Sequence, residues 1–437
     1  MIDRRTLLAA SVATGVAAST PGLGAPKSGR FPEHFLWGAA TAGHQVEGNN
    51  TNSDCWLLEN VKPTTFAEPS RDAANSFELW PTDLDLVKNM GLNSYRFSLE
   101  WSRIEPEQGL FSMAMLDHYK RIIEGCRVRG LTPLVTFNHF TTPRWFAAVG
   151  GWSDARSVGL FARFCDKAAR HLAADIGYAT TLNEPNLAGL LQPLLPPEVS
   201  IGDKAMSEAA ARALGIAKFS AGNALFSDDP DTLQKNLLAG HKAGRDAIKA
   251  VRGDLPVGVS LAMFDDQAVG PNSLRDAKRA HFYGAWLEAA KGNDFLGVQN
   301  YERSLWSEKG KVDPPANARR NTMGSEVYPP SLAGAVRYAY AQTGIPIIVT
   351  EHGVGTDDDS LRAWLIPNAL VELKKAMDDG VPVKGYMHWS LIDNFEWIFG
   401  YRIKFGLHSF DPKTFVRTPK PSAAVYAKIA RANAVVV

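Results

Sequence analysis

Pro346-Ile347-Ile348-Val349-Thr350-Glu351 is an almost continuous apolar run that ends in a carboxylic acid. Runs of this kind are typical of parallel strands that are covered on both faces. Thr181-Leu182-Asn183-Glu184-Pro185 closes a second strand-like segment with another glutamate. Because the carboxyl ends of the strands in a parallel barrel converge on one rim, such a fold would bring these two distant glutamates together.

Further short segments rich in β-branched and aromatic residues alternate with helical stretches along the chain. This alternation indicates βα units that feed one parallel sheet. Eight such units predict an α/β fold, a single (β/α)8 barrel, and 437 residues suit one barrel with loop insertions at its carboxyl-terminal face. The strands are expected near residues 35–41, 94–99, 132–138, 178–183, 257–262, 295–300, 346–350 and 384–389.

Two stretches are longer than a crossover between strands requires. Residues 187–235 contain several helix-breaking prolines and predict an insertion after the fourth strand. This insertion either walls the functional site or is a surface excursion without a role. Residues 302–330 predict a second loop, irregular in structure, after the sixth strand.

Charge and cysteine content exclude several classes of function. Lys and Arg (47) nearly balance Asp and Glu (46), so no overall field favours nucleic acid or an acidic membrane surface. The expected partner is a small uncharged molecule, and the oligomeric state is left open. Cys55, Cys126 and Cys165 lack a Cys-x-x-Cys spacing, which argues against a zinc ribbon or a disulfide scaffold. Cys126 and Cys165 are expected to be small buried residues.

Residues 1–25 have the pattern of an export signal. Arg4-Arg5-Thr6-Leu7-Leu8 precedes a weakly apolar run, then Pro21 and small residues near Ala25. The paired arginines resemble a twin-arginine signal, and an ordinary secretory signal is the alternative. Either signal predicts a periplasmic or secreted protein whose mature domain spans residues 26–437.

Paired glutamates at strand ends suit the cleavage of glycosidic bonds. Such a bond breaks readily when its leaving oxygen is protonated while electron density reaches the anomeric carbon from the opposite face. One carboxyl must therefore be protonated and the other ionised. In the retaining mechanism the two carboxyls stand about 5 to 5.5 Å apart.

Several separate segments carry a close resemblance to family 1 glycoside hydrolases, the β-glucosidase and β-galactosidase group, and together they cover nearly the whole mature chain. The matching segments are Phe35-Leu36-Trp37-Gly38-Ala39-Ala40-Thr41, Tyr95-Arg96-Phe97-Ser98-Leu99-Glu100-Trp101-Ser102-Arg103-Ile104, Thr181-Leu182-Asn183-Glu184-Pro185, Trp389-Ser390-Leu391-Ile392-Asp393-Asn394-Phe395-Glu396-Trp397 and Lys404-Phe405-Gly406-Leu407.

The resemblance implies a role for each matching residue. Glu184 would be the acid/base and Glu351 the nucleophile of a retaining, exo-acting β-glycosidase, with unphosphorylated β-glucosides as the first expected substrates. Arg96 and Tyr301 would support the nucleophile, whose pKa a neighbouring arginine should lower. No cofactor or metal is implied. The expected sugar-binding residues are Gln45, His139, Asn183, Tyr301, Trp389 as an aromatic floor, Glu396 and Trp397. An anionic Glu396 would also repel a phosphate on the sugar.

Three segments depart from the family pattern. His352 follows Glu351 where asparagine is usual, Gln299-Asn300 replaces asparagine-tyrosine, and Phe140-Thr141 replaces tryptophan-aspartate. These changes concern the shape of the pocket, the preferred sugar and the pH optimum. His352 could add positive charge beside the nucleophile below its own pKa, in which case His352→Asn would shift the acidic limb of the pH–rate profile.

Three other functions remain possible from the sequence. Transglycosylation would use the same two glutamates with a sugar or alcohol in place of water, and a sugar-binding barrel without turnover would retain the pocket alone. A metal-dependent barrel hydrolase is suggested only by His139, His352 and His388 near strand ends, without the His-x-His pair that such enzymes commonly place after the first strand.

Overall fold

Eight parallel strands form a closed barrel in the computed structural model, which describes residues 29–192, 194–222 and 229–435. The order around the barrel is β1-β11-β10-β7-β5-β4-β3-β2, so strands that follow one another in the chain are neighbours in the barrel. The predicted (β/α)8 barrel is confirmed, and each strand lies close to its expected range. The bounds are β1 (Leu36–Ala40), β2 (Ser94–Ser98), β3 (Thr132–Asn138), β4 (Tyr178–Asn183), β5 (Val257–Ala262), β7 (Phe295–Asn300), β10 (Ile347–His352) and β11 (Val383–Trp389).

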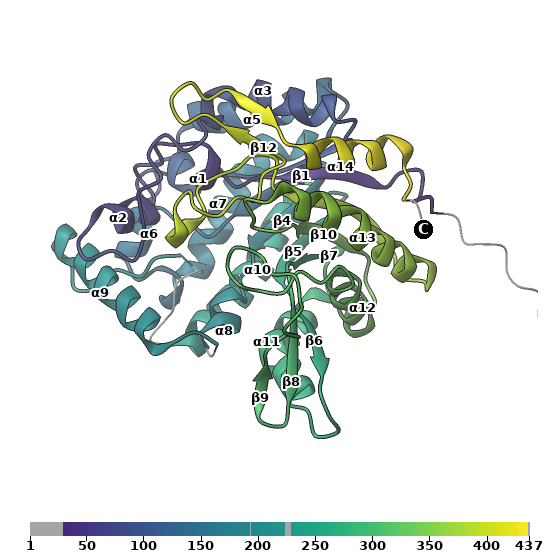
Figure 1. The fold of residues 1–437 in the computed structure, drawn as a ribbon. Helices are drawn as coiled ribbons and strands as arrows, with labels where there is room; N and C mark the ends of the chain where they lie inside the picture. Colours follow the sequence, from purple (N-terminus) through teal and green to yellow (C-terminus); the bar gives the residue numbers. More distant parts are fainter. Residues whose placement is uncertain (1–28, 193, 223–228, 436–437) are drawn as a thin grey trace, which may run out of the picture.

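Helices surround the barrel and cover the outer face of its strands (Figure 1). In α7 (Ser157–Leu172) the buried residues Phe161, Phe164, Cys165, Ala168 and Leu172 recur at helical spacing and form one apolar stripe. This stripe packs against α10 and, through Phe164, against Phe137 of β3. It includes one of the two cysteines expected to be buried. The other covering helices are α3 (Ser76–Asn89), α5 (Met113–Val128), α10 (Pro230–Val251), α11 (Arg275–Ala290), α12 (Ser331–Thr343), α13 (Asp359–Asp378) and α14 (Pro421–Ala432).

The insertion after β4 lies against the loops that follow β1 and β3. It contains α8 (Leu187–Leu191) and α9 (Pro197–Leu214), and α9 packs on α2 (Asp54–Asn60). The Gly222 amide donates to an Asp54 carboxyl oxygen over 2.7 Å, which ties the end of the insertion to α2. Gly222 also lies directly against the backbone oxygen of Phe140, just after β3. The insertion therefore borders the barrel mouth and is not a detached excursion.

A three-stranded sheet projects from the barrel beside α11 (Figure 1). It is formed by β6 (Asp265–Ala268), β8 (Arg303–Ser307) and β9 (Gly310–Val312). The guanidinium of Arg303 pairs with Glu326 over 2.7 Å and stacks on the ring of Tyr328, which ties the rest of the segment to the sheet. The expectation of an irregular loop at 302–330 is therefore wrong for its first part.

The two ends of the described chain lie side by side, before the start of β1. The Phe31 amide donates to the Asn433 carbonyl over 3.0 Å, and Arg30 bridges to Ala434. The expected export signal lies outside the described residues. The remaining short elements are α1 (Gly43–Val46), α4 (Trp101–Ile104), α6 (Arg144–Ala148), η1 (Gly151–Ser153), η2 (Ala173–Asp175), η3 (Trp397–Phe399), β12 (His408–Phe410) and β13 (Arg417–Pro419).

Two findings bear on the classes considered from the sequence. Cys55, Cys126 and Cys165 are all buried as free thiols, as expected for the latter two. Within the residues that the structure describes, no helix combines the length and apolarity needed to cross a bilayer.

Candidate active site

Glu351 lies at the end of β10 with both carboxyl oxygens engaged. The Arg96 guanidinium, on β2, donates to Oε1, and the Tyr301 hydroxyl, just after β7, donates to Oε2 over 2.6 Å. Glu351 is buried, with 4% of the residue exposed. Because Glu351 and its two partners lie on or directly after three different strands, the closed barrel itself holds this carboxylate in place.

The electrostatic surroundings of Glu351 only partly match the expectation from the sequence. Burial raises the pKa of its carboxyl, while the positive charge of Arg96 and the hydrogen bonds from Arg96 and Tyr301 oppose the rise. The predicted effect of Arg96 is present, but the net shift is upward and not downward. The extent to which the Glu351 carboxyl is buried could not be judged from the sequence.

Glu184 follows β4 and its backbone has a left-handed conformation, with φ at 42°. Its amide donates to the carbonyl of Ser260 on β5 over 2.8 Å, which fixes the residue at the strand end. Burial and the charge of Glu351 together raise the pKa of Glu184 well above its usual range, against the opposing charge of Arg96. The two carboxyls are thus close enough to interact, and Glu184 holds its proton more firmly than Glu351.

Asn183 connects the nucleophile side of the site to His139. Its side-chain oxygen accepts from Arg96 over 2.6 Å and from Gln299 over 2.8 Å. Its amide nitrogen lies 3.2 Å from His139 Nε2. Two donors on the oxygen fix which way the amide points. Burial and the charge of Arg96 hold the pKa of His139 well below its usual range, so its ring is neutral and accepts from Asn183.

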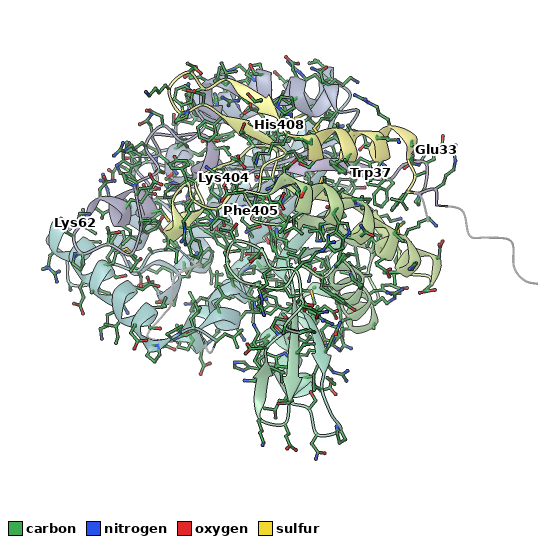
Figure 2. All side chains as sticks on the ribbon, viewed as in Figure 1. Glu33, Trp37, Lys62, Lys404, Phe405 and His408 are labelled. Atoms are coloured by element: carbon green, nitrogen blue, oxygen red, sulfur yellow. The ribbon has the colours of Figure 1, made fainter. Side chains whose placement is uncertain are left out.

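Aromatic rings line the same region of the barrel mouth. Trp389, at the end of β11, stacks on the His139 ring with 5.8 Å between centroids and 16° between planes. Trp397 also lies parallel to His139, at 6.3 Å and 12°. Phe405, labelled near the centre of Figure 2, packs edge-on against Tyr301 at 5.6 Å. Flat apolar faces beside hydrogen-bonding groups are what the two faces of a pyranose ring require.

Gln45 and Glu396 form the outer part of the site. The Gln45 amide nitrogen donates to the Phe395 carbonyl over 2.9 Å and to a Glu396 carboxyl oxygen over 3.2 Å. The side-chain oxygen of Gln45 and the Nδ1 atom of His139 are buried without a hydrogen-bond partner in the structure. Buried polar atoms of this kind lose free energy unless a ligand or water satisfies them, so both are available to hydroxyl groups.

The chain as a whole matches a family of known activity. The sequence model described as "Glycosyl hydrolase family 1" matches residues 27–219 and 285–435. The chain belongs to glycosyl hydrolase family 1. The resemblance inferred from the sequence is confirmed, and the protein is a β-glycosidase that acts on small glycosides. The unmatched interval, residues 220–284, contains α10, β5 and β6.

Known relatives of this family 1 glycosidase share its length as well as its fold. A β-glucosidase from Agrobacterium sp. is 29% identical over 92% of this chain and 95% of its own length. The crystal structure of β-glycosidase BGL167 is 45% identical, with a TM-score of 0.87 over 93% of this chain and 98% of its own. An apo structure of β-glucosidase 1317 is 40% identical, with a TM-score of 0.88 over 91% and 98% of the two chains.

His352 does not share the surroundings of Glu351 in this glycosidase. Its Nδ1 atom lies 2.9 Å from the Tyr386 hydroxyl, and the Tyr386 ring packs on Tyr426 of α14. These contacts place the side chain toward the helical layer. Burial lowers the pKa of His352 to about 3, which leaves the imidazole neutral near pH 7. The expected positive charge beside the nucleophile is therefore wrong.

Glu396 also differs from the expectation. Desolvation and the charge of Glu351 raise its pKa to about 8, against a hydrogen bond from Gln45. Below that pH Glu396 is mainly protonated, so repulsion of a phosphate by this side chain is weaker than predicted.

The metal alternative from the sequence receives no geometric support. His388 lies 3.2 Å from the Tyr386 hydroxyl and His352 bonds the same hydroxyl, so both belong to the helical layer and not to the site with His139. Among the residues described, no group of three or more His, Cys, Asp or Glu side chains is arranged to hold a metal ion.

Sequence reasoning gave no supporting role to several residues that hold the site from behind. Gln299 orients Asn183, and Thr141 donates to Glu100 over 2.9 Å. His44 stacks on Trp397, with 5.7 Å between centroids. His44 had a readable signal, because it directly precedes Gln45 at the end of a predicted strand.

Proposed function

We propose that this family 1 glycosidase is a retaining, exo-acting β-glucosidase that hydrolyses unphosphorylated β-glycosides. The observation that carries the proposal is the electrostatic asymmetry of the two carboxyls. Glu351 is held by one cation and one hydroxyl donor, whereas the charge of Glu351 adds to burial in raising the pKa of Glu184. A double displacement needs this combination of one ionised and one protonated carboxyl.

In the first step of the proposed mechanism, Glu184 gives its proton to the glycosidic oxygen as the bond from that oxygen to the anomeric carbon breaks. A Glu351 oxygen attacks the anomeric carbon from the opposite face and forms a covalent glycosyl ester, and the aglycone leaves as an alcohol. Arg96 and Tyr301 orient the attacking carboxylate, because each donates to one of its oxygens.

In the second step a water molecule opens the ester. Forming the ester removes the negative charge of Glu351, which is one of the causes that raise the pKa of Glu184. The pKa of Glu184 therefore falls once the ester is present, and the ionised Glu184 takes a proton from the attacking water. Glu351 leaves as a carboxylate, and two inversions at the anomeric carbon give net retention.

Glucose is the proposed sugar of the non-reducing end. The Agrobacterium relative and the protein of the apo structure, β-glucosidase 1317, are both β-glucosidases. The unpartnered oxygen of Gln45 and the unpartnered Nδ1 of His139 supply one acceptor and one donor for sugar hydroxyls. The Trp389 face offers an apolar surface for the ring.

Labelling with a 2-fluoro glycoside tests the roles and the sugar together. A 2-fluoro-β-glucoside with a good leaving group should inactivate the enzyme and add one sugar to the peptide that contains Glu351. Running the same reaction with 2-fluoro galactosides and mannosides ranks the sugar preference. A label on another residue would overturn the assignment. The anomer released from a β-glucoside can be followed by NMR, and initial release of the α-anomer would exclude retention.

We further infer that the protein is exported through a twin-arginine signal in residues 1–25, which supports a periplasmic or secreted location. The inference rests on Arg4-Arg5 and the weakly apolar run after them. Replacing both arginines by lysine should leave the precursor in the cytoplasm, as cell fractionation would detect. Export that continues unchanged would favour an ordinary secretory signal.

A further inference from the structure

Trp397 has a backbone conformation that its side chain must help to hold. Its φ of 48° lies in the left-handed region, which is unfavourable for a bulky residue. The indole lies parallel to the ring of His44, with 5.7 Å between centroids and 7° between planes. Phe140 contacts the same indole edge-on at 5.2 Å. The position of Trp397 therefore depends on the aromatic groups around it.

His44 is held by a hydrogen bond from one of its ring nitrogens to a fixed carboxylate. It belongs to α1, the single turn after β1, and is 1% exposed. Its Nε2 atom lies 2.7 Å from Glu59 Oε1. The other oxygen of Glu59 accepts from both the amide and the hydroxyl of Ser70, each over 2.8 Å. Glu59 is thus a fixed anchor for the His44 ring.

The second nitrogen of His44 is also engaged. The Asn50 amide nitrogen lies 3.2 Å from Nδ1 and donates to Glu100 over 2.6 Å, while the Asn50 oxygen accepts from Ser102 over 2.7 Å. Since the Asn50 oxygen is occupied, its NH2 group points at Nδ1, which therefore accepts. The hydrogen of His44 is then on Nε2 and is donated to Glu59.

The charges around His44 strengthen this anchor. Burial lowers the pKa of His44. The carboxylates of Glu59, Glu100 and Asp54 together raise it by more, so the net shift is upward. Nε2 keeps its hydrogen whether the ring is neutral or charged. Protonation changes only the Nδ1 side and would strengthen the attraction of the ring for the indole face.

We propose that His44, anchored by Glu59, is a positioning residue that fixes the Trp397 indole and thereby sets the affinity of the enzyme for the sugar. The inference rests on the proposed function, because Trp397 and the preceding Glu396 are expected sugar contacts there. Both nitrogens of His44 are bound to protein groups, so the imidazole acts through its face and not by proton transfer. Substrate binding should therefore depend on His44 more than bond cleavage does.

Kinetics of three variants test this role. His44→Phe keeps an aromatic ring but loses the anchor, and Glu59→Gln weakens the anchor. Because the Trp397 indole would be held less firmly, each variant should raise KM for an aryl β-glucoside about two- to tenfold, with kcat nearly unchanged. If Glu59 acts through His44, the double variant should have a KM no higher than that of His44→Phe. In His44→Phe the Glu59 carboxylate is buried without its partner. The double variant replaces this charge by a neutral amide and is therefore less prone to misfold.

His118→Phe is the matched control. His118 is also buried, and it stacks on Phe77 with 3.9 Å between centroids, away from the sugar-binding residues. Its replacement should leave KM unchanged. The proposal would be overturned by an unchanged KM in His44→Phe, or by changes of kcat and KM in His118→Phe as large as those in His44→Phe. Additive increases of KM in the double variant would overturn it as well.

A crystal structure of the double variant keeps the test independent of turnover. The Trp397 indole should be displaced or adopt several orientations, and an indole in its original place would contradict the proposed role. Absence of turnover by the unmodified enzyme on all β-glycosides would instead refute the proposed function, and the position of the indole would still decide the role of His44.

Discussion

Removal of the Tyr301 hydroxyl should move the acidic limb of the pH–rate profile to higher pH. In the structure this hydroxyl donates to Glu351 over 2.6 Å and opposes the rise of the carboxyl pKa that burial causes. The bond stabilises the ionised form, so its loss in Tyr301→Phe raises the pKa of Glu351. The proposed reaction needs Glu351 ionised, and activity would therefore be lost at a higher pH than in the unmodified enzyme.

The size of the shift follows from the type of bond. A hydrogen bond to a charged group contributes about 1.5–3 kcal/mol, and about 1.36 kcal/mol corresponds to one pKa unit. The acidic limb should therefore move upward by about one to two units. The assay is kcat/KM for an aryl β-glucoside from acidic to neutral pH, because this quantity reports the pKa values of the free enzyme.

Tyr386→Phe is the matched control for this measurement. The Tyr386 hydroxyl is also buried and hydrogen-bonded, but its partners are His352 and His388 in the helical layer. This variant should lose stability and keep the acidic limb in place. A limb that stays fixed in Tyr301→Phe, or that moves equally in both variants, would refute the reasoning that Tyr301 tunes Glu351.

Three further predictions concern pH and packing. His352→Asn should leave the acidic limb unchanged and lower Tm, since His352 is neutral, with a pKa of about 3, and faces the helices; a shifted limb in the rate profile would contradict this. Glu396→Gln should raise Tm relative to the unmodified enzyme, and by more at pH 9 than at pH 5. A carboxyl whose pKa in the folded state is raised to about 8 lowers the free energy of unfolding increasingly as the pH rises toward that value. Calorimetry at both pH values checks the sign. Gly297→Ala would place a methyl group 2.5 Å from the Ser260 hydroxyl and should lower the free energy of unfolding by about 1–3 kcal/mol. Gly284→Ala, which faces open space on α11, should leave that free energy unchanged or raise it slightly, and urea unfolding of both variants measures the difference.

The barrel could be predicted because its strands carry a local signal. Each parallel strand is covered on both faces, so it appears in the sequence as a short apolar run, as Ile347–Val349 illustrates. The sheet formed by β6, β8 and β9 has no such signal. Its pattern at Arg303–Ser307 alternates between buried and half-buried residues over only five positions, and its pairing with β6 is a long-range contact.

The candidate site was predictable where residues stand at strand ends on the inner face. His139, Asn183, Glu351 and Trp389 all occupy such positions and meet at the barrel mouth, whereas Gln45 lies in α1 after β1. The direction of a side chain and its burial were harder to foresee. His352 follows Glu351 in the chain but faces the opposite layer. Strand alternation alone would not have settled this, because the register of β10 is irregular between Val349 and His352.

Burial explains the remaining misjudgements of charge. The sequence identified Arg96 beside Glu351 and a carboxyl at Glu396, but it gave no measure of how completely water is excluded from them. Desolvation is the largest cause of the pKa shifts at both Glu351 and Glu396. The network of Glu59, Asn50 and Glu100 behind His44 likewise joins loops whose closeness only the fold establishes.

The hydrogen bond between Phe31 and Asn433 suggests that the chain can be circularly permuted without disturbing the active site. A short glycine-rich linker could join these neighbouring ends, because they already meet at the amino-terminal side of the barrel strands. New termini could then be opened at Glu308–Lys309, in the exposed turn between β8 and β9. Such a circular permutant would carry a fusion partner on the projecting sheet and keep every strand of the barrel intact.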